Sequence, residues 1–60
     1  MTYTVSCLAS LQPQCLFELL ALPARILSRT QADGFAAITI ECDDATAEMI
    51  GERWYIEENQ

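Results

Sequence analysis

The sequence predicts an α+β fold in which two helices cover one face of a four-stranded antiparallel sheet. Three observations support this fold: period-two alternation in two segments, apolar stripes with helical spacing after each of them, and a Gly-containing turn between two predicted strands. The predicted elements follow one another in the order strand, helix, strand, strand, helix, strand. We expect residues 1–60 to form a single small domain.

The first strand is predicted over residues 2–9. Tyr3, Val5 and Cys7 fall on one side, and the small or polar residues between them fall on the other. Alternation of this kind, with β-branched and aromatic residues, is typical of a half-buried strand.

The first helix is predicted from Pro13 to about Ala21. Proline suits the first helical position, where its missing N–H is not needed. A proline also disfavours the helical conformation of the residue before it, so we expect the helix to end ahead of Pro23. The apolar stripe expected to face the sheet consists of Leu16, Phe17, Leu19, Leu20 and Pro23.

The middle of the chain predicts a hairpin. We expect residues 26–31 to form a strand that pairs either within its own chain or with a neighbouring copy. Ala32-Asp33-Gly34 is a turn signal, because glycine accepts a positive φ without steric cost. Residues 35–42 alternate again and form the next predicted strand.

The second helix is predicted to begin at Asp43 and Asp44, because an Asp side chain caps free backbone N–H groups and suits the positive end of the helix dipole. Gly51 is its expected C-terminal stop. Its apolar stripe is expected to consist of Ala47, Ile50 and Trp54. A last short strand is expected at residues 54–56.

This order of elements predicts a compact ferredoxin-like βαββαβ sandwich. Both helices then lie on one face of the sheet, and the other face is either solvated or covered by a second copy. A chain of this length buries only roughly 60% of its unfolded surface. With 52% hydrophobic residues, the chain is expected to hide its excess apolar surface by forming a homo-oligomer.

Most of the chain resembles an ACT-type regulatory domain, and in particular the small regulatory subunits of acetolactate synthase. The resemblance is carried by "YTVSCLASLQPQCLFELLALPAR" and by "ILSRTQADGFAAITIECDDATAEMI". The first stretch resembles the family's strand, proline-containing loop and Leu-rich helix; the second resembles its hairpin and the strand leading into the second helix. The resemblance implies a ferredoxin-like fold and a regulatory function in which an amino acid is bound.

The charge balance excludes several partners. The net charge is −6, the chain has three Arg and no Lys, and eight of its nine acidic residues lie in residues 31–60. No basic stripe is present to neutralise phosphates, so neither nucleic acid nor an anionic membrane is an expected partner.

The apolar run of residues 15–27 is interrupted by charges and is shorter than the roughly 20 residues that span a bilayer. Three cysteines without close pairs predict reduced thiols in the cytoplasm.

The segment Gln12-Pro13-Gln14 is the candidate ligand site. Free N–H groups at the start of the first helix are able to receive a carboxylate, and the two glutamine amides are able to add hydrogen bonds. The alternative interpretation is that the segment only turns the chain and starts the helix. Tyr55 is the candidate interface residue, because aromatic rings dominate buried contacts, whereas core packing is an equal alternative for Trp54.

No catalytic site, cofactor or metal is expected. Cys15 lies in a first helical turn, where a thiol gains reactivity, but the chain has no His to act as its base, so an unreactive thiol, packed or merely exposed, is the favoured interpretation. The spacing of four carboxylates matches no calcium loop, and helix capping with a solvated acidic face explains them better: Glu41, Asp43, Asp44 and Glu48. Without His or Lys, general acid–base catalysis by the isolated chain is not expected.

Two functions are consistent with these observations. The first is a non-enzymatic regulatory or small-ligand-binding module that acts as a homodimer or larger homo-oligomer, with an effector such as an amino acid near Gln12, Pro13 and Gln14. The second is a small acidic interaction or inhibitor module that docks on a basic protein partner through the acidic half of the chain. A third possibility is that the chain is a subunit without activity of its own.

Overall fold

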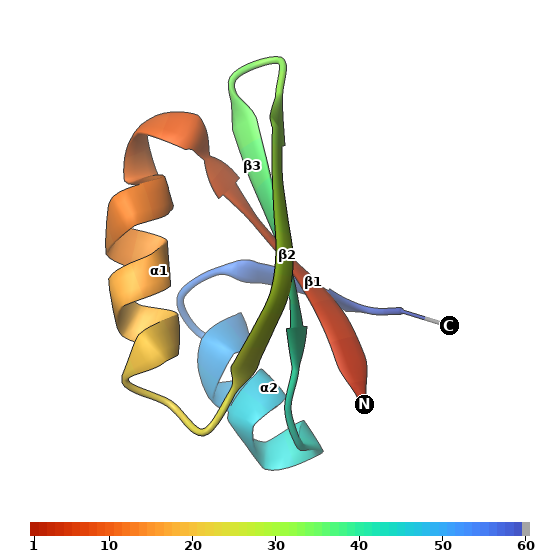
Figure 1. The fold of residues 1–60 in the computed structure, drawn as a ribbon. Helices are drawn as coiled ribbons and strands as arrows, with labels where there is room; N and C mark the ends of the chain where they lie inside the picture. Colours follow the sequence, from red (N-terminus) through yellow and green to blue (C-terminus); the bar gives the residue numbers. More distant parts are fainter. Residues whose placement is uncertain (60) are drawn as a thin grey trace.

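The computed structural model describes residues 1–59, and its elements follow the predicted order with one addition (Figure 1). The elements are β1 (Thr2–Leu8), a 3₁₀ helix η1 (Ala9–Leu11), α1 (Gln12–Leu20), β2 (Arg25–Ala32), β3 (Phe35–Glu41), α2 (Asp44–Gly51) and β4 (Tyr55–Glu58). The 3₁₀ helix was not predicted; it fills the interval in which a loop was expected.

The four strands form one antiparallel sheet in the order β2-β3-β1-β4. β1 and β3 are central and pair along their full length, from Thr2 opposite Glu41 to Leu8 opposite Phe35. β2 pairs with β3 of its own chain, which decides between the two pairings left open by the sequence. The molecule is therefore an α+β structure with a four-stranded antiparallel sheet and two helices.

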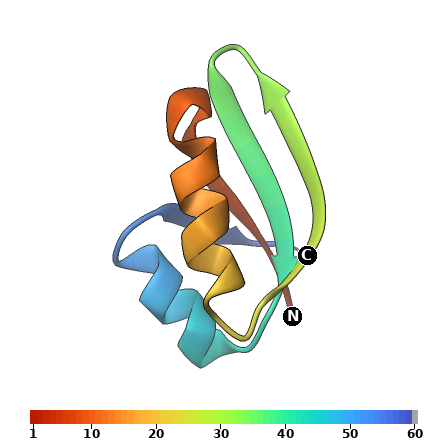
Figure 2. The same cartoon turned by 60° about the vertical axis from the view of Figure 1, so that its left-hand side comes forward.

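The hydrophobic core lies between the sheet and the helices. The alternation predicted for the central strands is confirmed, since every second residue of β1 and β3 is buried. Both helices pack on this same face of the sheet, and the opposite face carries no helix (Figure 2). The buried hydrophobic residues are Tyr3, Val5, Cys7, Cys15, Leu19, Ala36, Ile38, Ile40, Cys42, Ala47 and Ile50. The sheet face without helices is called the uncovered face below.

The hairpin between β2 and β3 has the predicted turn. Asp33 has φ of 56° and Gly34 has φ of 81°. Two consecutive residues with positive φ are typical of the tight turns that match the twist of antiparallel strands. At the other end of the hairpin, a register shift between Ile26 and Ser28 interrupts the pairing.

The second helix begins as predicted, because the Asp43 side chain accepts a hydrogen bond from Thr46 N at 2.8 Å. Its expected apolar stripe is wrong at one position. The helix ends at Gly51, and Trp54 lies beyond it, with its backbone N donating to Ile50 O at 2.9 Å. Trp54 packs against the core from the segment that leads into β4. Among residues 1–59, no helix has the length and apolar character needed to cross a bilayer.

Candidate functional site

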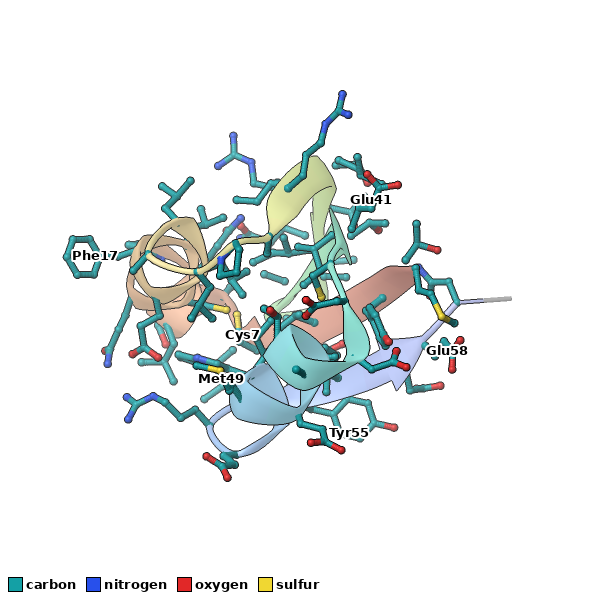
Figure 3. The ribbon with its side chains drawn as sticks, turned by 90° about the horizontal axis from the view of Figure 1, so that it is seen from below. Cys7, Phe17, Glu41, Met49, Tyr55 and Glu58 are labelled. Carbon is teal, nitrogen blue, oxygen red and sulfur yellow. The ribbon has the colours of Figure 1, made fainter. Side chains whose placement is uncertain are left out.

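The outer side of the helical layer contains an apolar groove of about 340 Å³ between α1 and α2, which we call the helix groove. Its lining residues are Phe17, Glu18, Ala21, Leu22, Met49, Glu52 and Arg53. In Figure 3, Phe17 extends outward from α1, and Met49 lies between the two helices. The groove therefore combines side chains that are about thirty residues apart in the sequence.

The rotation of α1 about its axis places Phe17 in the groove. Cys15 and Leu19 are buried and define the side of α1 that faces the sheet. At about 100° per residue, Phe17 lies on nearly the opposite side of the helix from Leu19. The expected apolar stripe is therefore wrong at three positions: Phe17 is 75% exposed, Leu20 is 72% exposed, and Pro23 lies after the helix and is also exposed.

Met49 provides the second apolar wall and is 54% exposed. Together with Phe17, it gives the groove two large apolar side chains that are exposed. An apolar hollow with a few polar side chains around it is typical of a binding site. We therefore treat the helix groove as the candidate functional site.

Glu18 fixes the relative position of the two walls. Its carboxylate accepts hydrogen bonds from Arg53 Nε at 2.6 Å, from Arg53 Nη2 at 2.9 Å and from Trp54 Nε1 at 3.0 Å. The Arg53 guanidinium is the main cause that lowers the pKa of Glu18, followed by the Trp54 indole. The ionised form of Glu18 is therefore favoured, and its carboxylate links α1 to the segment after α2.

The rim of the groove is acidic. Glu52 follows directly after α2, is exposed and belongs to the lining of the groove. Arg53 is paired with Glu18, and this is the one ion pair found within the described part of the chain. The positive charge of Arg53 is thus matched by Glu18, and Glu52 is the remaining charged side chain of the lining.

The predicted ligand site at Gln12, Pro13 and Gln14 forms the first turn of α1 and not a separate loop. Pro13 and Gln14 are exposed and Gln12 is half-buried. The Gln14 side chain donates to Glu18 Oε2 at 3.3 Å, so this amide points along the helix toward the groove. Binding of an effector at these three residues stays a prediction.

The predicted interface residue Tyr55 begins β4 and is 64% exposed. It lies opposite Ser6, on the uncovered face of the sheet, and its hydroxyl donates to Glu57 Oε1 at 3.0 Å. Gln12, Pro13 and Gln14 belong to the helix on the other side of the sheet. The structure therefore does not bring the two predicted sites together, and neither of them includes the groove.

All three cysteines are buried free thiols. Cys7 lies opposite Ala36, whereas Cys42 is at the other end of the same pair of strands, so the two do not meet as the sequence allowed. Cys7 instead neighbours Cys15. Burial, and then the proximity of Cys7, raise the pKa of the Cys15 thiol to about 12. A protonated, enclosed thiol supports the packed interpretation of Cys15.

The acidic residues at the start of α2 have structural partners. Asp43 caps the helix, and the Tyr3 hydroxyl donates to an Asp44 carboxylate oxygen. Within residues 1–59, no three acidic or cysteine side chains are gathered as they are in a metal site.

The chain matches no protein-family model, no curated protein and no solved structure. Function is therefore inferred from the helix groove, the distribution of charge and the exposed parts of the sheet.

Proposed function

We propose that this chain is a non-enzymatic protein-interaction module that docks on a basic partner through the helix groove. The observation that carries the proposal is the combination of apolar walls with an acidic rim. Phe17 and Met49 offer apolar contact area, and Glu52 offers a negative charge beside it, while the Arg53 charge is paired with Glu18. The complementary surface is apolar along one stripe and basic along its edges.

The occupant that fits best is an amphipathic helix with Lys or Arg beside its apolar stripe. Such a helix binds in a groove through its apolar side chains, which are three and four positions apart in its sequence. A second copy of this chain fits poorly, because each copy has a net charge of −6 and two grooves placed face to face would bring Glu52 of both copies together. The net charge of −6 would also speed the encounter with a basic partner by electrostatic attraction.

The test is the binding of a labelled amphipathic Leu/Lys model peptide, followed by fluorescence anisotropy. A peptide with Glu in place of Lys is the matched control. We expect the Lys peptide to bind and to weaken as salt is raised, and the Glu peptide not to bind. Equal binding of the two peptides would contradict the proposal.

Two substitutions locate the binding surface. Phe17→Ser removes the larger apolar wall and is expected to weaken peptide binding by about tenfold or more, because buried aromatic anchors dominate such interfaces. Leu8→Ser is the matched control, since Leu8 is 50% exposed but lies on β1, opposite Phe35 at the end of the sheet. A larger effect of Leu8→Ser than of Phe17→Ser would place the site elsewhere.

We also propose that the fold is of the ferredoxin-like type. The strand order β2-β3-β1-β4 and the two helices on one face support this assignment.

A regulatory homo-oligomer similar to an ACT domain is the second candidate function. It is supported by the uncovered sheet face and by the start of α1, where the N-cap Leu11 makes no side-chain capping bond. A thermal-shift screen with free amino acids tests it: stabilisation that is lost in Gln14→Ala would favour an effector site, and no shift would count against one.

A further inference from the structure

The two edges of the sheet carry opposite charges. β2 has the sequence RILSRTQA, with two of the three arginines of the chain and no acidic residue. β4 has the sequence YIEE, with two glutamates and no basic residue. Nearly all residues of both strands are exposed, and Figure 3 shows Tyr55 and Glu58 on the β4 side of the molecule. Each edge also has backbone N–H and C=O groups that no further strand pairs.

The strand directions allow these edges to meet. All neighbouring strands in the order β2-β3-β1-β4 are antiparallel, so β2 and β4 run in opposite directions. A second copy placed with its β2 beside β4 of the first therefore continues the antiparallel pattern. The helices of both copies then lie on the same side of one eight-stranded sheet.

The side-chain faces select a register. Arg29 lies opposite Ile38, and Glu58 lies opposite Tyr3, so both belong to the face covered by the helices. Placing Glu58 of one copy opposite Arg29 of the next gives a direct cross-strand pair of opposite charge. Because paired positions run in opposite directions, the same register places Tyr55 opposite Ala32 on the uncovered face.

The bulge in β2 lies outside the proposed pairing. It lies between Ile26 and Ser28, whereas the proposed pairing uses residues 29–32. The regular pairing after the bulge covers Ser28–Ala32, so this part of the β2 edge is long enough for the four residues of β4. Pairing of β2 with β2 would oppose arginines, and pairing of β4 with β4 would oppose glutamates.

We propose that copies of this chain associate head to tail, with β4 of one copy against β2 of the next and Glu58 opposite Arg29. The proposal rests on the homo-oligomer named above as the second candidate function and is independent of the helix groove. Because the two surfaces of this interface differ, the assembly grows into rings or short filaments and does not close as a dimer.

Sedimentation velocity over a range of protein concentrations tests the assembly. We expect the average mass of the full chain to rise with concentration beyond that of a dimer. Arg29→Glu and Glu58→Arg are each expected to weaken association by about tenfold or more, because attraction between the paired charges becomes repulsion. An equimolar mixture of these two variants restores opposite charges across the interface and is expected to restore association.

Arg25→Glu is the matched control, because Arg25 lies on the same strand but outside the register. It is expected to associate more strongly than Arg29→Glu. A monomeric full chain at all concentrations would overturn both the head-to-tail proposal and the homo-oligomer. The head-to-tail interface would be overturned if Arg29→Glu and Glu58→Arg associate as strongly as wild type, or if mixing them does not restore association. Either result would still be consistent with a homo-oligomer that uses another interface.

Discussion

Leu19 and Leu20 are adjacent leucines on α1 whose exposures differ so much that truncating each should have very different effects. Leu19 is 1% exposed, and Leu20 is 72% exposed. Leu19→Ala removes three carbon atoms from an enclosed site and leaves a cavity, which costs about 3 kcal/mol of unfolding free energy, within a range of roughly 2–5 kcal/mol. Leu20→Ala removes the same atoms from the surface and is expected to change stability by about 0.5 kcal/mol or less.

The size of the loss is large for a chain of 60 residues. At roughly 0.05–0.15 kcal/mol per residue, the whole unfolding free energy is about 3–9 kcal/mol. Leu19→Ala is therefore expected to remove a third or more of it. For domains of this size each kcal/mol changes Tm by about 4–8 °C, so Tm should fall by roughly 12–24 °C.

Urea and thermal unfolding followed by far-UV circular dichroism measure both variants, at low protein concentration and with a reductant that keeps the thiols free. A loss for Leu20→Ala as large as that for Leu19→Ala would show that the rotation of α1 is wrong. Phe17 would then not be where we place it, and the helix groove would lose one of its walls.

Three further results are expected from titratable groups. Asp43→Ala should lower Tm because the Thr46 amide loses its capping oxygen, whereas Asp43→Asn keeps a cap. The hydrogen bonds from Thr46 lower the pKa of Asp43 from its ordinary value of 3.8. The ionised carboxylate therefore stabilises the fold above pH 3.8, and this stabilisation is lost as pH falls below that value. Thermal melts of wild type and Asp43→Asn should converge in acid. The hydrogen bond to Asp44 raises the pKa of Tyr3 from 10.0 to about 12. The stabilisation that this bond gives the fold is therefore present below pH 10.0 and is lost between pH 10.0 and about 12. Thermal melts of Tyr3→Phe should not show this loss. Cys15 should resist thiol reagents in native buffer and react once urea unfolds the chain; fast native labelling at this position, read by mass spectrometry of peptides, would refute its enclosure.

The strands were predictable because their signal is local. Alternation of apolar and small residues defines the buried faces of β1 and β3, and Asp33-Gly34 marks the turn between β2 and β3. The pairing of β2 was not predictable. Nearly all of its residues are exposed, so its sequence has no alternation that indicates a partner strand. The structure shows that the partner is β3 of the same chain.

The helix groove was not predictable for a different reason. In α1 nearly every residue from Cys15 to Leu22 is apolar, with Glu18 as the exception, so the periodicity gives little contrast between the two sides. Cys15 and Leu19 face the core, and Phe17 is left outside. The second wall, Met49, comes from α2, and its distance from α1 depends on how both helices pack on the sheet.

The bond from the Trp54 indole to Glu18 has a practical consequence. Trp54 is the single tryptophan of the chain, and its Nε1 is held at 3.0 Å by the carboxylate that also lines the groove. Indole emission responds to the polarity and hydrogen bonding around the ring. The protein thus contains its own optical reporter at the candidate site: any molecule that enters between the helices and disturbs this carboxylate should change the colour or the yield of the emitted light without an added dye.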